Sequence, residues 1–229
     1  MMDEGKNMSS GMNAFENDLF KKIGPGGMDR VQSTKVGIAG AGGLGSNCAM
    51  NLVRCGFKKF VIADFDKVEY SNLDRQFYFL SQVGDVKVEA LKVNLMKINP
   101  TLEIETFHVM ITSENIKNIF GSCAVVVEAF DGAENKKMLV EVFSGTEKFV
   151  VSASGICGIG GSDTVKTRKI GENLVIIGDQ LSDVGLVPPF SPRVNLAAAK
   201  QADAVLEYVL GRDRFVPIAR ALDAGGGDK

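Results

Sequence analysis

Four glycines and one aspartate in this chain have the spacing of a nucleotide-phosphate site. Gly40, Gly42, Gly43 and Gly45 follow an apolar run over 35–39 and precede a helix-like run that starts near position 46. Backbone amides at a helix N-terminus attract phosphate, and glycines let the phosphate approach closely. Asp64 closes the next apolar run at the spacing expected for an acid that binds a ribose hydroxyl. The glycines alone are a weak signal, whereas loop, second strand and terminal acid together predict nucleotide binding.

Charged side chains further along could neutralise and orient phosphates. Arginine offers a planar fork of donors, as Arg75 would, and lysine offers a point charge, as Lys87 would. Lys87 opens a predicted helix, a poor electrostatic position for a cation, which favours a phosphate role over a solvated side chain. Asp131 follows an apolar strand at its carboxyl end, where ligands of open α/β sheets bind. Two alternatives stay open: Asp64 could be a solvated acid or a helix cap, and Arg75 could pair with Asp74 or Asp85 on the surface.

The elements that must position these residues alternate between strand and helix, which predicts βαβ units with right-handed crossovers. We expect strands at 36–39, 60–63, 102–109, 124–127 and 149–152, and helices at 46–55, 86–98, 112–119, 133–143 and 196–210. The pattern changes after Gly155, where 164–170 and 173–177 are typical of a hairpin. The predicted fold class is therefore α/β, a doubly wound, mostly parallel, Rossmann-like sheet with antiparallel C-terminal strands. The long irregular connection over 70–85 has a length that is often functional.

Composition excludes several classes of protein. The chain has 229 residues and a formal charge of −2, which argues against a sequence-independent grip on nucleic acid. No apolar run approaches the roughly 20 residues that span a bilayer, and the N-terminus lacks the apolar core of a secretory signal. The 4 cysteines form no Cys-x-x-Cys pair, so we expect no zinc, no disulfide framework and a cytoplasmic location. Residues 1–27 are expected to be a loosely ordered arm, and 28–229 a single domain.

The blocks 40–45, 64–68 and 71–76, together with Lys87 and Asp131, resemble the ThiF/MoeB/HesA family of the ubiquitin-activating-enzyme superfamily. Most similar are the short ThiF-type sulfur carrier protein adenylyltransferases without zinc motifs, and the resemblance runs from about 35 to 210. The block 64–76 is its specific part, because a dinucleotide dehydrogenase has no reason to carry Asn-Leu-x-Arg-Gln after its ribose acid. The family binds ATP and adenylates the C-terminal glycine of a small ubiquitin-like protein.

The resemblance also implies roles for individual residues. It implies catalytic roles for Arg75, Lys87 and Asp131, with Asp131 also holding Mg²⁺. Nucleotide contacts would come from the glycine loop and the residues after it, namely Gly40, Gly42, Gly43, Gly45, Asp64, Asp66, Asn72, Arg75, Gln76 and Lys87. The implied partners are a ThiS-like carrier of thiamine biosynthesis, a separate sulfur donor and a second copy of the chain.

This chain departs from better-known family members at three places. Leu181 stands where covalent relatives carry a cysteine, an arginine-containing N-terminal stretch is missing, and Asp131-Gly132 replaces an Asp-Asn pair. These changes leave adenylation intact and put thioester chemistry in doubt, because a leucine cannot form a thioester. Two other functions stay open, a nucleotide-binding regulator without turnover and a relative of dehydratases that activate a tRNA-bound carboxylate. The near-neutral charge counts against the tRNA version.

Overall fold

The computed structural model describes residues 11–211, and its centre is a seven-stranded sheet in the order β3-β2-β1-β4-β5-β7-β6. The strands are β1 (Lys35–Ala39), β2 (Lys59–Asp64), β3 (Glu103–His108), β4 (Val125–Glu128), β5 (Phe149–Ala153), β6 (Lys166–Ile170) and β7 (Leu174–Gly178). All pairings are parallel except that of β6 with β7. The predicted doubly wound sheet with an antiparallel C-terminal pair is therefore confirmed.

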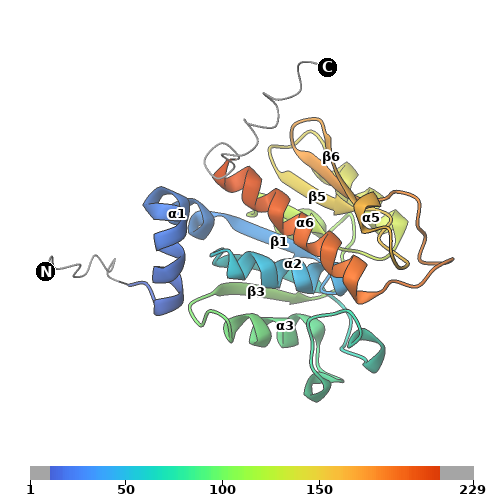
Figure 1. Cartoon of the computed structure of the whole chain (residues 1–229), viewed down its shortest axis with the longest axis horizontal. Coiled ribbons are helices and arrows are strands. Elements are labelled where there is room, and N and C mark those ends of the chain that lie inside the picture. The colour runs from blue at the N-terminus through green and yellow to red at the C-terminus, as the bar shows by residue number, and fades with distance from the viewer. Residues whose placement is uncertain (1–10, 212–229) are drawn as a thin grey trace, which may run out of the picture.

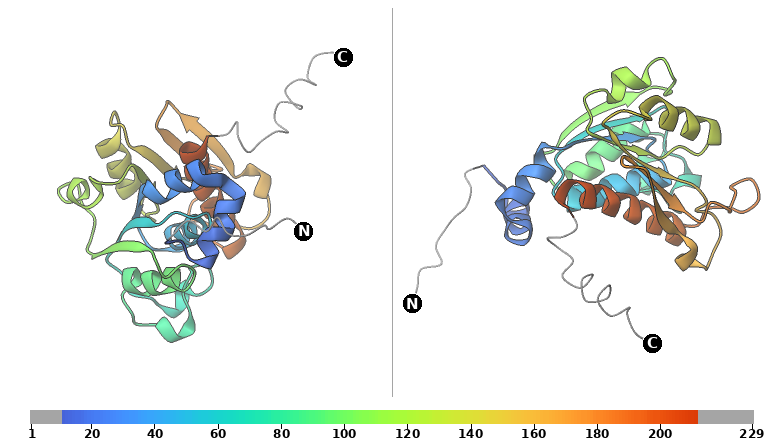
Figure 2. Two further views of the ribbon diagram at one scale, coloured as in Figure 1. Left: turned by 90° about the vertical axis from the view of Figure 1, so that its left-hand side faces the viewer. Right: turned by 90° about the horizontal axis from the view of Figure 1, so that it is seen from above.

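Helices cover both faces of the sheet (Figures 1 and 2). On one face lie α2 (Gly43–Arg54), α3 (Lys87–Met96) and α6 (Ser191–Leu210), and on the other lie α4 (Ile116–Phe120) and α5 (Ala133–Phe143). Each face has its own apolar core, and strand β4, which separates them, is buried along its whole length. Fully apolar strands are typical of a parallel sheet covered on both faces. Among residues 11–211, no helix combines the length and apolarity that a bilayer span needs.

The N-terminal region differs from the sequence prediction. Residues 1–10 lie outside the described part, but residues 14–27 belong to helix α1 (Ala14–Ser33), which packs against α6, so the expected loose arm is wrong there. Asn13 and Glu16 form a reciprocal N-terminal capping box. Glu16 is 1% exposed and accepts hydrogen bonds from Asn99 (3.1 Å) and the Thr101 hydroxyl (2.8 Å). These contacts between distant segments hold the N-terminal part of α1 in place. The helix kinks at Gly24.

Two helix boundaries near the glycine loop also differ from the prediction. Helix α2 begins at Gly43, so the last two glycines of the loop lie in its first turn. Helix α6 begins at Ser191 rather than 196, with a proline in its first turn, where the missing amide hydrogen has no intrahelical partner to lose. Both helices start at the carboxyl edge of the sheet, and their N-terminal turns lie close together, because Gly43 of α2 packs against Val194 of α6.

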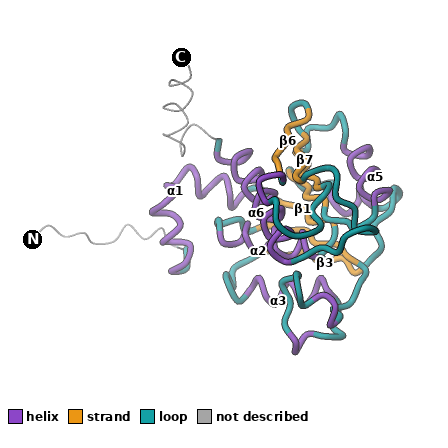
Figure 3. Tube along the Cα trace, turned by 45° about the vertical axis from the view of Figure 1, so that its right-hand side comes forward, coloured by secondary structure: helices purple, strands orange, loops and turns teal. Residues whose placement is uncertain are grey.

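The connection between β2 and α3 is held at its base. It contains two short helical turns, η1 (Tyr70–Asn72) and η2 (Leu80–Gln82). The Val68 amide donates to the Asp85 carbonyl at 2.8 Å, and the Gly84 amide donates to the Val68 carbonyl at 2.8 Å. Figure 3 looks toward the carboxyl ends of the strands and shows loops crossing that edge. The connection is thus an ordered loop, and it ends where α3 begins at Lys87.

Candidate nucleotide site

A cleft of about 190 Å³ opens at the carboxyl ends of β1, β2 and β4. It brings together six of the residues singled out from the sequence, which are Gly40, Gly42, Asp64, Asp66, Lys87 and Asp131. Strand β1 pairs with β2 on one side and β4 on the other, so the cleft lies where the order of the strands reverses. Larger hollows of about 410 and 620 Å³ lie beside the β6–β7 pair, but none of the predicted site residues lines them.

The glycines of the loop differ in what their environment demands. Gly40 has φ +100°, and a Cβ there would come within 2.7 Å of the Ala129 carbonyl oxygen. A Cβ at Gly45 would overlap the Gly40 carbonyl, and one at Gly43 would lie 2.9 Å from a Val194 methyl of α6. At Gly42 the nearest atom would be a Gln76 side-chain nitrogen at 3.9 Å. Gly40 therefore makes the turn, Gly43 and Gly45 permit packing, and Gly42 faces open space.

Asp64 is an integral part of the glycine loop rather than a solvated acid. Its side chain is 9% exposed and accepts the Ala41 amide at 2.6 Å and the Asp66 amide at 2.7 Å. A carboxylate has about four lone-pair positions, so two amides leave capacity for a hydroxyl donor. Asp64 is therefore not a solvated acid. Its place in the cleft is compatible with a role in ligand binding.

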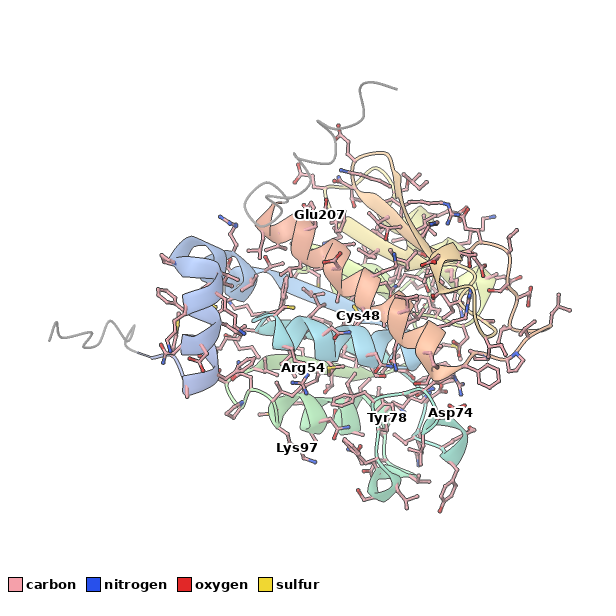
Figure 4. The ribbon with its side chains drawn as sticks, viewed as in Figure 1. Cys48, Arg54, Asp74, Tyr78, Lys97 and Glu207 are labelled. Carbon is pink, nitrogen blue, oxygen red and sulfur yellow. The ribbon has the colours of Figure 1, made fainter. Side chains whose placement is uncertain are left out.

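Lys87 presents a buried ammonium group to the cleft. Its side chain is 6% exposed, and its Nζ lies 2.8 Å from an Asp66 oxygen. Tyr78 ties this position to the glycine loop, because its hydroxyl donates to the Ala41 carbonyl at 2.7 Å and lies 3.3 Å from the Lys87 carbonyl. Burial, assisted by the charges of Asp64 and Asp66, raises the pKa of Tyr78, so the hydroxyl keeps its proton at neutral pH. Figure 4 shows Tyr78 on the connection that precedes α3.

Three predicted residues lie on that connection, outside the lining of the cleft. Arg75 lies 2.7 Å from Asp74 and donates to the Ser71 carbonyl at 2.9 Å, so the structure shows the surface pairing left open by the sequence. Asn72 accepts the Glu69 amide at 3.0 Å as part of a local cap. The Gln76 side-chain oxygen is buried and accepts no hydrogen bond within residues 11–211. The connection is joined to α2 by Asn47, which donates to the Arg75 carbonyl at 2.9 Å.

The cleft offers few carboxylates that could bind Mg²⁺. Within the described residues no three His, Cys, Asp or Glu side chains are grouped closely enough to hold a metal by themselves. Mg²⁺ is commonly bound by one or two carboxylates plus substrate phosphates. Exposed Asp131 and half-exposed Asp66 both line the cleft and suit that arrangement.

Sequence reasoning missed two polar residues at the cleft, one buried beneath it and one in its lining. Glu128 ends β4 with 0% exposure, and Asn135 of α5 contributes to the lining. The signal for Glu128 was a single acid closing an otherwise apolar strand, directly before Asp131 and its neighbours. Its partners come from other elements and could not be read from the local sequence.

A doubly wound sheet with a glycine loop at the reversal of strand order defines the Rossmann-like class of α/β fold. Within that class, the ThiF family model matches residues 16–212, so the chain belongs to the ThiF family.

Two curated relatives and one solved structure illustrate the similarity. The adenylyltransferase and sulfurtransferase MOCS3 of Aedes aegypti is 33% identical over 139 residues, which are 60% of this chain and 32% of the relative. The sulfur carrier protein adenylyltransferase of Thermus thermophilus is 35% identical over 114 residues, 49% of this chain and 42% of the relative. The E. coli tRNA N6-threonylcarbamoyladenosine dehydratase TcdA in complex with AMP superposes with a TM-score of 0.76 at 16% identity, covering 90% and 95% of the two chains. The chain thus spans about a third to two fifths of these curated relatives.

Proposed function

We propose that this protein uses ATP to adenylate the C-terminal glycine carboxylate of a small ubiquitin-fold sulfur carrier protein. The observation that carries the proposal is the meeting of Gly42, Lys87 and Asp131 in one cleft at the reversal of strand order. A relative named as a sulfur carrier protein adenylyltransferase supports the same reaction class.

The residues of the cleft suit the chemistry of acyl adenylation. A carboxylate oxygen attacks the α-phosphorus, the bond to the bridging oxygen of the β-phosphate breaks, and pyrophosphate leaves. The attacking group and the phosphates are all anions, so a cation must reduce their repulsion and align them. Lys87 supplies this charge, and binding of the triphosphate would compete with its present partner Asp66. The carboxylate is already ionised at neutral pH, so the reaction needs no general base from the protein.

The remaining roles follow the positions of the side chains. Asp64 would accept a ribose hydroxyl, the free amides of the first turn of α2 would bind phosphate, and Asp131 would hold Mg²⁺ with the phosphates. Arg75 would have to leave Asp74 to reach the nucleotide, since the two side chains are now 2.7 Å apart.

Family membership also supports finer proposals about partners. The carrier would be ThiS-like and serve thiamine biosynthesis, and sulfur would come from a separate donor. Leu181 is 89% exposed and has no nucleophilic atom, which fits an enzyme that stops at the adenylate. We further propose a homodimer, which sedimentation at micromolar concentration would test, and a monomer alone would refute it.

A second candidate function is activation of a carboxylate on tRNA. The E. coli dehydratase TcdA in complex with ATP superposes with a TM-score of 0.77 and is covered over 96% of its chain, but at 16% identity this likeness concerns the fold. The net charge of −2 offers little attraction for a polyanion.

The test is ATP–pyrophosphate exchange with a panel of purified ubiquitin-fold carriers, including ThiS-like proteins. We expect exchange with one carrier and none when its C-terminal glycine is deleted, because the attacking carboxylate would then be misplaced. Exchange that depends on tRNA instead would favour the second function. ATP binding without exchange by any carrier or tRNA would favour a regulator.

A further inference from the structure

Glu128, at the end of β4, is a buried acid to which the reaction assigns no role. Its side chain is 0% exposed beneath a cleft that the next residues of the chain line. Burying a carboxylate is costly unless it is paired and hydrogen-bonded, so a residue kept there must be well satisfied.

The partners of Glu128 come from four separate segments. One carboxylate oxygen accepts the Phe130 amide at 2.7 Å and lies 3.1 Å from the Lys136 ammonium of α5. The other accepts the Ser152 hydroxyl of β5 at 2.6 Å. The backbone carbonyl of Glu128 accepts the Gln201 side chain of α6 at 2.9 Å. One residue therefore joins two strands, two helices and the loop over 129–132.

That loop carries Asp131 and adjoins the glycine loop. The Ala129 carbonyl lies where any Cβ on Gly40 would collide with it, so the two loops are in close contact. Lys136 lies in the first turn of α5, a poor electrostatic position for a cation, and the carboxylate of Glu128 offsets this. The hydrogen bond from the Phe130 amide to the Glu128 carboxylate fixes the backbone one residue before Asp131.

We propose that Glu128 is a positioning residue that holds the loop over 129–132 so that Asp131 faces the metal and phosphates. This inference rests on the proposed adenylation reaction. It differs from a purely structural role in one respect: the effect of losing Glu128 must pass through Asp131.

The test is a double-mutant cycle of Glu128→Gln and Asp131→Asn, read by pyrophosphate exchange at several Mg²⁺ concentrations. In the parental protein Glu128→Gln should lower exchange about 10- to 100-fold, as small displacements of a reacting group do, and raise the Mg²⁺ concentration for half-maximal rate. In the Asp131→Asn background the same change should have an effect of about twofold or less. Equal effects in both backgrounds would overturn the proposal.

Two further variants keep the test decisive. Glu141→Gln makes the same chemical change on α5, at an exposed residue paired with Lys137 at 3.6 Å, and should leave exchange unchanged. If Glu128→Gln does not fold, Ser152→Ala removes one contact of the carboxylate and should shift the Mg²⁺ dependence in the same direction.

Calorimetric titration separates failure of this inference from failure of the proposed reaction. If the parental protein exchanges with no carrier, the reaction is refuted, but titration with ATP still tests Glu128. Glu128→Gln should then weaken binding of Mg–ATP and leave binding of ATP in EDTA within about threefold, as expected for an effect exerted through the metal contact. Equal weakening of both would contradict the role.

Discussion

A methyl group placed at Gly42 should separate nucleotide binding from folding. Gly42 is the N-cap of α2, with φ −79° and ψ −150°, an extended conformation outside the left-handed region that favours glycine. The nearest atom to a Cβ there would be the Gln76 side-chain nitrogen at 3.9 Å, so the methyl group fits. It would, however, point into the space through which a phosphate must approach the amides of the first turn.

The magnitude follows from the contacts that the methyl would block. A hydrogen bond to a charged group contributes about 1.5–3 kcal/mol, so losing one should weaken ATP binding about 10- to 150-fold. Stability should change by less than about 1 kcal/mol, because alanine is a poorer N-cap than glycine but has less conformational freedom in the unfolded chain.

The assay is calorimetric titration of Gly42→Ala with Mg–ATP, beside a urea unfolding curve of the same protein. Gly45→Ala is the matched control, because its methyl would overlap the Gly40 backbone and should cost about 3 kcal/mol or more of stability. Unchanged ATP affinity in a folded Gly42→Ala protein would refute the assignment of this loop to phosphate.

Three further predictions concern other residues. Asp131→Asn should slow pyrophosphate exchange about 100- to 1,000-fold, while urea unfolding stays within about 0.5 kcal/mol of the parent because the side chain is exposed. Burial raises the pKa of Glu16, but hydrogen bonds from Asn99, Thr101 and Asn13 and the nearby Lys58 lower it overall, below its ordinary 4.5. Its stabilisation is therefore complete above pH 4.5 and is lost as pH falls through the folded pKa, so urea unfolding of Glu16→Gln should vary less between pH 6 and about pH 3. Burial also raises the pKa of Cys157, so its thiol should react slowly with iodoacetamide at neutral pH. Replacing all four cysteines should leave pyrophosphate exchange near the parental rate. Loss of exchange in a folded Cys157→Ser protein would contradict this.

The sequence predicted well those elements whose pattern is local. The apolar run at 124–127 lies within one residue of β4, and the helix expected at 133–143 is α5 residue for residue. Such segments carry their own signal, because a strand buried on both faces is largely apolar and the apolar residues of an amphipathic helix recur every three to four positions. The glycine loop and the acid after β2 were recognisable for the same reason.

What the sequence could not give depends on contacts between distant segments. The loose arm was expected because residues 1–27 are polar and contain several glycines, yet Asn99 and Thr101, from distant segments, hydrogen-bond the buried Glu16 of α1. The helix expected over 112–119 is the shorter α4, because residues 113–115 form a turn in which the Asn115 side chain accepts the Thr112 amide at 2.8 Å. Arg75 was recognised by its motif, but its pairing with Asp74 is a matter of side-chain geometry.

The two edge strands have a consequence for how the protein behaves in solution. An exposed edge offers unpaired amide and carbonyl groups to another molecule, and charged side chains oppose such pairing. In the described part of the chain, β6 carries Lys166, Arg168 and Lys169, whereas β3 carries Glu103 and Glu105. Two copies that met through the same edge would bring like charges together. Salt shortens the range of this repulsion to about 3 Å at 1 M, so resistance to pairing through the same edge should be greatest in dilute buffer.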